Sequence, residues 1–164
     1  MKYNSIQDIL SICEETGKPF WRVIMEEDMQ ESAMSETSSF EKMREMYRAM
    51  ADADRNYDAG LKSESRMTGG DGQKLHEYNE AGRNLCGDFV GLAMEKAIKM
   101  GESNACMRRI VAAPTAGACG VIPAVLLSYQ ELYHAEEDGM VEAMFTAGRC
   151  SLRGLHRDFH PQLF

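Results

Sequence analysis

The sequence lacks the patterns that mark several large classes of protein. None of its five cysteines belongs to a C-x-x-C pair, so we expect neither a disulfide framework nor a self-contained zinc site, and reduced, mostly buried thiols are the default. No run of about 18 apolar residues occurs, so no membrane span is expected. The N-terminal residues hold no long apolar stretch of the kind a secretion signal needs, which favours a cytoplasmic protein.

Positive charge is also scarce. The chain has 18 Lys and Arg against 26 Asp and Glu, a net charge of −8. A nucleic-acid binder needs a concentrated basic face to neutralise phosphates, so no nucleic-acid partner is expected. The length of 164 residues suits one domain with a real core.

Strand patterns are missing, and helical spacing takes their place. No stretch of convincing length alternates apolar and polar residues, so the predicted fold is all-α, a multi-helix domain. Ser5 with Asp8 resembles a capping box that starts a helix, Gly17 ends that helix, and Pro19 opens a second one. Residues 31–39 are polar and serine-rich, which indicates a linker, with Ser39 as a candidate cap for a third helix.

The later helices are predicted from apolar stripes. From Gln73 the pattern is helical, with Glu95, Lys96 and Lys99 expected on the solvent side and Gly101 expected at the end. The predicted core-facing stripe of this segment comprises Phe89, Val90, Ala93, Met94, Ala97 and Ile98. Residues 136–139 are interpreted as a turn before a last helix.

Residues 60–72 are rich in glycine and hydroxyl side chains and predict a loop, since Gly costs about 1 kcal/mol against Ala in a helix interior. Loops of this length in compact domains are often functional. Ser65 and Thr68 are suited to binding a carboxylate beside the Gly69 and Gly70 backbone. The alternative is a flexible, solvated connection, and Asp71 is a candidate helix cap.

Residues 114–120 form a second loop with almost no side-chain bulk, against which a ligand could lie close to the main chain. Pro123 then falls in the first turn of a helix, where its missing N–H has no partner to lose. A helix N-terminus favours anions such as a carboxylate. The alternative is a tight connection between two packed helices. The apolar face of the following helix is predicted to contain Val121, Ile122, Val125, Leu126, Tyr129, Leu132 and Tyr133.

The residues around this second loop form a long motif: Asn104-Ala105, then IVAAPTAGACGVIPAVLL at 110–127. Further matching pieces lie at residues 60–61, at Ser65, at 67–71, at the N-terminal Ser5-Ile6 and at 145–148. Together they resemble the α subunit, or α domain, of iron–sulfur-dependent L-serine dehydratases. The resemblance covers most of the chain without a gap in its central segment.

That resemblance implies an L-serine ammonia-lyase, which converts L-serine to pyruvate and ammonia. It implies these substrate-binding candidates: Ser65, Thr68, Gly69, Gly70, Asn104, Thr115, Ala116 and Gly117. The catalytic base is not identified, because neither His76 nor His134 matches a catalytic position of the family.

The resemblance also implies a [4Fe–4S] cluster held by three cysteines, with one open iron acting as a Lewis acid on the serine hydroxyl, and a β subunit as partner. The ligand cysteines of the family belong to segments beyond residue 148, which this sequence does not contain. No metal ligand is therefore assigned, and the chain is not expected to bind the cluster alone. Arg108 stands where the family usually has Gly.

The expected domain division is 1–148, the N-terminal part of the α domain, and 149–164, an atypical tail with no helical or strand period. Our hypothesis for the tail is a shifted reading frame near residue 148, and the alternative is a natural divergent tail. In either case the chain is expected to be a C-terminally truncated α subunit that is inactive alone.

Two other functions compete with this interpretation. One is a non-catalytic helical interaction protein that binds a β-type partner. The other is a pyridoxal-phosphate lyase, for which Lys62 near Gly69 and Gly70 is only a weak imitation of a Schiff-base site. Nucleotide phosphate binding is disfavoured because no G-x-x-x-x-G-K-[ST] pattern occurs.

Overall fold

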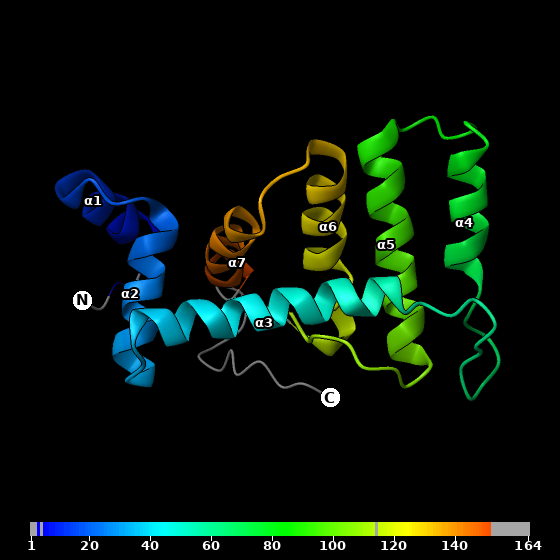
Figure 1. Cartoon of the computed structure of the whole chain (residues 1–164), viewed down its shortest axis with the longest axis horizontal. Helices are drawn as coiled ribbons and strands as arrows, with labels where there is room; N and C mark the ends of the chain where they lie inside the picture. Colours follow the sequence, from blue (N-terminus) through cyan, green and yellow to red (C-terminus); the bar gives the residue numbers. More distant parts are fainter. Residues whose placement is uncertain (1–2, 4, 114, 152–164) are drawn as a thin grey trace. The chain divides into compact units, whose positions relative to one another are not determined.

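The computed structural model describes residues 3, 5–113 and 115–151, the side chains of 149–151 excepted. Within these residues the chain forms seven α-helices and a short 3₁₀ helix, and no β-strand, which confirms the all-α prediction (Figure 1). The chain divides into two compact units. Unit 1 holds the residues up to Tyr47 and those from Glu137, and unit 2 holds Arg48–Glu136.

Unit 1 begins with two helices whose ends are set by local sequence. α1 (Ile6–Thr16) starts at a complete capping box: the Ser5 hydroxyl accepts from the Asp8 N–H at 3.0 Å, and the Asp8 carboxylate accepts from the Ser5 N–H at 2.8 Å. Gly17 ends the helix at φ 67°. α2 (Phe20–Ser32) follows Pro19. All three predicted boundaries are confirmed.

The predicted linker is wrong in extent. α2 continues to Ser32 and α3 (Glu36–Arg55) begins at Glu36, so only residues 33–35 connect them. Ser39 is not a cap: it lies inside α3, is buried, and donates to the Asp28 carboxylate at 3.0 Å. The Ser35 hydroxyl accepts from the Ser38 N–H at 3.2 Å instead. Residues 31–39 contain few apolar side chains, so the apolar stripe that marks an amphipathic helix is hard to recognise there, and the segment was interpreted as a linker.

The core of unit 1 is apolar and aromatic. α2 packs against α7 (Glu137–Ser151), and the Phe40 ring lies 6.3 Å from both the Trp21 and the Phe145 ring centroids. Met25 and Val141 have no exposed surface. Packing of this kind stabilises a fold by removing apolar area from water.

α7 begins earlier than expected, so the predicted turn at 136–139 is wrong for all but its first residue. Glu137 and Asp138 lie in the first turn of α7, where acidic side chains favour the positive end of the helix dipole. The last residues of α7 reach into the predicted tail, of which residues 152–164 lie outside the described part of the chain.

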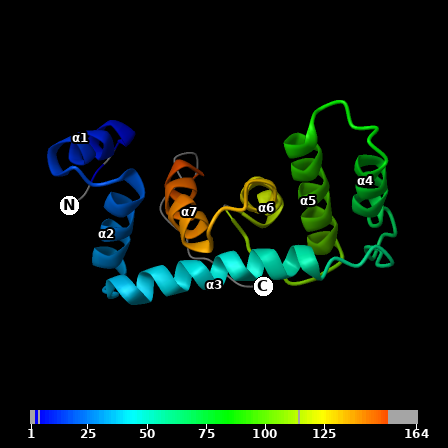
Figure 2. The ribbon, with the colours of Figure 1, turned by 45° about the horizontal axis from the view of Figure 1, so that its top comes forward.

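Unit 2 is organised around α5 (Asp88–Ala105), which packs against both α4 (Asp71–Glu80) and α6 (Val121–Tyr133) (Figure 1). The helical pattern that begins at Gln73 is thus two helices, joined by the connection at 81–87 (Figure 2). Gly101 lies inside α5, so the predicted end there is wrong. Tertiary packing outweighs the helix propensity lost at a single glycine, about 1 kcal/mol.

The buried face of α5 is not the predicted one. Val90 and Met94 are 44% and 47% exposed, whereas Glu95 and Lys96, which we expected in solvent, are 3% and 5% exposed. Lys96 Nζ binds Asp54 at 2.7 Å and Glu131 at 2.9 Å, which ties α5 to α3 and α6. The charges are buried because partners on neighbouring helices neutralise them.

Glu95 connects α5 to α4, as Lys96 connects α5 to α3 and α6. It accepts from Lys99 at 2.5 Å, lies 3.0 Å from His76 Nδ1, and accepts from Asn79 at 3.2 Å. Asn79 also donates to the Gly91 carbonyl at 3.0 Å. A Cβ at Gly91 would lie 1.6 Å from Asn84 Nδ2, so the connection at 81–87 can lie this close to α5 only because residue 91 is glycine.

The face that α6 buries is rotated from the predicted one. Ile122 and Leu126 are buried as expected, together with Ala124 and Leu127. Five members of the predicted apolar face are instead exposed: Val121, Val125, Tyr129, Leu132 and Tyr133. In the described residues, none of the helices has the length and apolar character needed to cross a membrane.

Candidate functional site

The first predicted loop is closed by its own hydrogen bonds. The Ser63 N–H donates to the Thr68 carbonyl at 2.9 Å, and the Thr68 N–H donates to the Ser63 hydroxyl at 3.2 Å. Lys62 Nζ donates to the Gly69 carbonyl. Ser65 is exposed, with its hydroxyl 3.2 Å from that of Ser63. The segment is therefore a hydrogen-bonded loop rather than a loose connection, and the contributions of Ser63 and Lys62 to closing it were not predicted from the sequence.

Glycine is required where this loop enters α4. Gly69 has φ 134°, and a Cβ there would lie 2.2 Å from the Leu61 carbonyl oxygen. Gly70, at φ 83°, is the N-cap of α4. Asp71 is consequently the first helical residue and not the cap, and its carboxylate binds Lys74 at 2.7 Å.

A buried carboxylate of the protein itself occupies the N-terminus of α4. Glu102, on the last turns of α5, accepts from the Asp71 N–H at 2.8 Å, the Gly72 N–H at 3.1 Å and the Tyr57 hydroxyl at 2.5 Å. Helix N-termini attract anions because their first N–H groups have no intrahelical acceptor. The anion at the N-terminus of α4 is therefore the protein's own Glu102.

The protonation states of this pair follow from their surroundings. Burial by itself raises the pKa of Glu102, but the hydrogen bonds from Tyr57, Asp71 and Gly72 outweigh burial and leave the pKa below its ordinary value. Burial and donation to Glu102 raise the pKa of Tyr57 to about 12. At neutral pH an ionised carboxylate therefore accepts from a neutral hydroxyl.

The spacing of Glu102 with Glu95 and Lys99 is visible in the sequence, but Glu95 and Lys99 were predicted to face solvent. Glu95, Lys99 and Glu102 recur at i, i+4 and i+7, which places three charged residues on one helical face. Such a face is usually solvated. Here it packs against α4, and the loop glycines let the α4 N–H groups reach the carboxylate.

The second predicted segment is attached to the same end of α5. Asn104 Nδ2 donates to the Ala116 carbonyl at 3.0 Å. The Thr115 hydroxyl accepts from the Ala118 N–H at 3.2 Å and so caps the 3₁₀ helix η1 (Ala116–Ala118). Thr115, Ala116 and Gly117 are all exposed.

The last turns of α5 thus hold both segments, through Glu102 on one side and Asn104 on the other. The small hollow beside Gly69, Ser103 and Cys106 has a volume of about 10 Å³, room for about one water molecule. The structure brings the two sets of predicted residues to one helix end, but this hollow is too small for an amino acid, so their role in substrate binding stays a prediction.

The described cysteines do not fit an iron–sulfur cluster. Among the residues that the structure describes, no three Cys, His, Asp or Glu side chains converge on a common point. Cys119 is buried, and burial raises the pKa of its thiol, which disfavours the thiolate that a metal requires. Cys86 is exposed and Cys13 and Cys106 are half-buried, so among the four cysteines whose side chains the structure describes, the expectation of mostly buried thiols holds only for Cys119.

The two histidines considered as bases lie elsewhere in unit 2. His76 is on α4 and its Nδ1 faces the buried Glu95 carboxylate. His134 follows α6 with φ 53° and is exposed. In the described part of the chain, neither forms a hydrogen bond or ion pair with the segments described above, so no base is assigned.

Comparison with known proteins identifies the family of this chain. A family model described as serine dehydratase alpha chain matches residues 15–153. The chain belongs to the serine dehydratase α-chain family. The L-serine dehydratase alpha chain of Peptoniphilus asaccharolyticus is 31% identical over 145 residues, which are 88% of this chain and 50% of that protein.

Two further relatives match over a similar share of this chain. The probable L-serine dehydratase alpha chain of Bacillus subtilis is 30% identical, over 89% of this chain and 49% of that protein. The L-serine dehydratase of Streptomyces coelicolor is 33% identical, over 88% of this chain and 32% of its own length. The present chain spans about half the length of the α chains it matches. No solved structure matches it.

Proposed function

We propose that this member of the serine dehydratase family acts as part of an L-serine ammonia-lyase, releasing pyruvate and ammonia from L-serine. The names of the relatives support a dehydratase of serine. The observation that carries the proposal is the attachment of both glycine-rich segments to one end of α5, by Glu102 to Asp71 and by Asn104 to Ala116.

In this proposal the chain's own residues bind and orient the substrate. The exposed hydroxyl of Ser65, with that of Thr68, donates to the carboxylate of serine, and Gly69, Gly70 and Gly117 permit close approach of the main chain. Asn104 holds the segment that contains Thr115 and Ala116 in place. Glu102 fixes the N-terminus of α4 and keeps a second carboxylate from binding there.

The [4Fe–4S] cluster implied by the family resemblance would supply a Lewis acid for the departing hydroxide. Because the described side chains provide no three convergent ligands, we derive no step through it. We propose instead that cluster ligands, and the rest of a pocket large enough for serine, come from outside the described residues. A serine dehydratase β subunit is the proposed partner, and the cytoplasm the proposed location.

The test is anaerobic reconstitution of the chain with iron and sulfide, with and without a cognate β subunit, followed by measurement of pyruvate release from L-serine. If the proposal holds, pyruvate forms only in a reconstituted assembly that supplies the missing ligands. In that assembly Ser65→Ala with Thr68→Ala raises KM more than it lowers kcat, whereas the exposed Ser11→Ala in unit 1 changes neither. Equal effects of the two sets would contradict the assignment.

A second candidate is a non-catalytic protein that binds a β-type partner. The exposed apolar side chains of α6, such as Val125 at 48% and Tyr133 at 61%, favour it, because contiguous exposed apolar surface marks interaction sites. Co-purification with the β subunit, in the absence of pyruvate formation in every reconstituted assembly, would select this alternative.

A further inference from the structure

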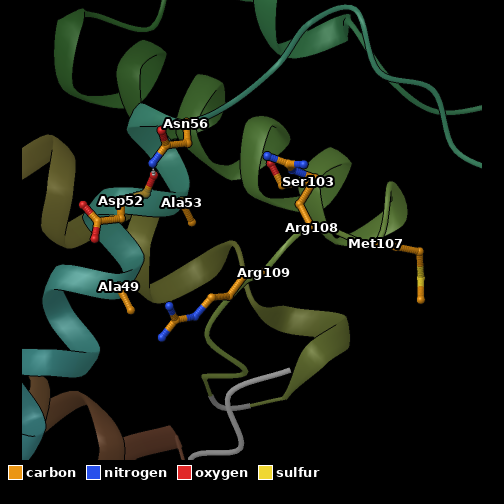
Figure 3. A pocket seen from close by; sticks show the side chains of 8 residues that line it. All are labelled: Ala49, Asp52, Ala53, Asn56, Ser103, Met107, Arg108 and Arg109. Carbon is orange, nitrogen blue, oxygen red and sulfur yellow. Dashed lines mark hydrogen bonds between the residues drawn. The ribbon is translucent and has the colours of Figure 1, made fainter.

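A larger cleft lies within unit 2 and shares Ser103 and Arg108 with the small hollow described above. It has a volume of about 430 Å³ and opens between the end of α3 and the residues that follow α5 (Figure 3). Ala49 and Ala53 form its apolar side on α3, and Asn56 and Ser103 add polar groups. This volume falls in the range of small-molecule sites, roughly 300–1,000 Å³.

The backbone after α5 directs two consecutive arginines to this cleft. The Met107 N–H donates to the Asn104 carbonyl at 3.0 Å and the Arg108 N–H to the Ser103 carbonyl at 2.9 Å, the bond pattern of a Schellman motif. Met107 takes the left-handed position at φ 58°. The chain therefore turns sharply, and both Arg108 and Arg109 line the cleft. Figure 3 shows Arg109 reaching towards α3 and Arg108 lying beside Ser103.

Neither guanidinium has a partner within the described residues, although the chain carries a net charge of −8. Other arginines do have partners: Arg22 binds Glu36, and Arg44 binds Asp138. The acid at the cleft, Asp52, is already paired with Arg55 at 2.5 Å.

These charges leave a local excess of positive charge. Two unpaired guanidinium groups on an acidic protein attract an anion, and planar guanidinium groups match the oxygens of carboxylate and phosphate.

We propose that this cleft binds a small organic anion, whose carboxylate or phosphate group is held by Arg108 and Arg109. The Ala49 and Ala53 side accommodates a short apolar portion of the ligand, and the Ser103 hydroxyl is placed to donate to it. The site does not depend on the proposed lyase function, because its residues are not the substrate-binding candidates and its occupancy can be measured without turnover.

The experiment is a titration of the isotopically labelled chain followed by ¹H–¹⁵N NMR, including the arginine Nε–H signals. Three arms are compared at constant ionic strength: inorganic phosphate, succinate, and sodium chloride alone. Saturable shifts at Asn56, Ser103 and the two arginines with phosphate or succinate, and not with chloride, are expected. The arm that binds more tightly identifies the anion group.

Matched variants distinguish a specific anion site from non-specific electrostatic attraction. Arg108→Gln with Arg109→Gln weakens binding by about a hundredfold, since each change removes a charge-assisted hydrogen bond worth about tenfold in affinity. Arg66→Gln removes another exposed arginine without a described partner, outside the cleft, and leaves binding unchanged. Arg108→Lys with Arg109→Lys restores part of the affinity.

The proposal is overturned if the shifts do not saturate, if chloride produces them equally, or if Arg66→Gln weakens binding as much as the double Gln variant. Because both side chains are exposed and unpartnered, the double variant keeps the thermal unfolding midpoint of the parent chain. A lowered midpoint with unchanged affinity would also count against a ligand role.

Discussion

The two units bury different kinds of side chain. In unit 1 the fully buried residues include Met25 and Val141, and Trp21 and Phe145 lie against the Phe40 ring. In unit 2 the central helix turns Glu95, Lys96 and Glu102 inwards, each held by partners on neighbouring segments. Apolar contacts tolerate change in proportion to the volume removed, whereas a buried ion pair fails as soon as one partner is lost.

The largest effect is expected at Lys96. Lys96→Met leaves the Asp54 carboxylate, 13% exposed, without its cation and lowers the free energy of unfolding by about 3–5 kcal/mol. Chemical denaturation followed by far-UV circular dichroism measures it. Adding Asp54→Leu removes the orphaned charge and restores most of the loss; a double variant no more stable than the single one would mean that Lys96 acts through packing alone.

In unit 1 the corresponding change is Met25→Ala. Removing this fully buried side chain is expected to cost about 2–5 kcal/mol, because a cavity remains where the core cannot collapse. Trp21, the only tryptophan, lies in the same unit and reports unfolding by fluorescence. Met67→Ala, at a position 87% exposed, is the control and stays within about 0.5 kcal/mol of the parent.

The contact between Tyr57 and Glu102 makes unit 2 sensitive to acid. Glu102 has a lowered pKa in the folded chain, so its contribution to stability is complete above its ordinary pKa of 4.5 and is lost as the pH falls through the lower folded value. Tyr57→Phe removes one donor to this carboxylate and costs about 1.5–3 kcal/mol at neutral pH. Because the folded pKa of Glu102 then rises towards its ordinary value, the further loss of stability below pH 4.5 becomes smaller than in the parent. The partly exposed Tyr78→Phe is the control, and the measurement is the unfolding free energy as a function of pH.

The smallest effect is expected at two helix ends, where Gly17 and Met107 adopt the left-handed backbone conformation. α1 ends at Gly17 with φ 67°, whereas the turn after α5 places Met107 at φ 58°. A side chain disfavours this conformation, so Met107→Gly is expected to raise the free energy of unfolding by about 0.5–1 kcal/mol and Gly17→Ala to lower it by a similar amount. Thermal unfolding of both variants measures the pair, and a loss of stability on Met107→Gly would show that the methionine side chain packs usefully.

Much of the fold was predictable because local signals set it. The capping box at Ser5 and Asp8, the end of α1 at Gly17 and the start of α2 after Pro19 each depend on residues within one helical turn. The loop at 60–72 was predicted for the same reason, since its glycines and hydroxyls disfavour a helix. The family resemblance likewise follows from contiguous residues.

What the sequence by itself determined is therefore the all-α class, the family and the places where several helices begin or end. The tertiary structure alone decided which faces are buried: Glu95 and Lys96 point inwards because Asn79, Asp54 and Glu131 supply partners from other helices, and Val90 and Val125 are left outside. It also decided that Glu102 fills the N-terminus of α4 and that two arginines share a cleft. Both depend on contacts between residues far apart in the chain, which no local pattern encodes.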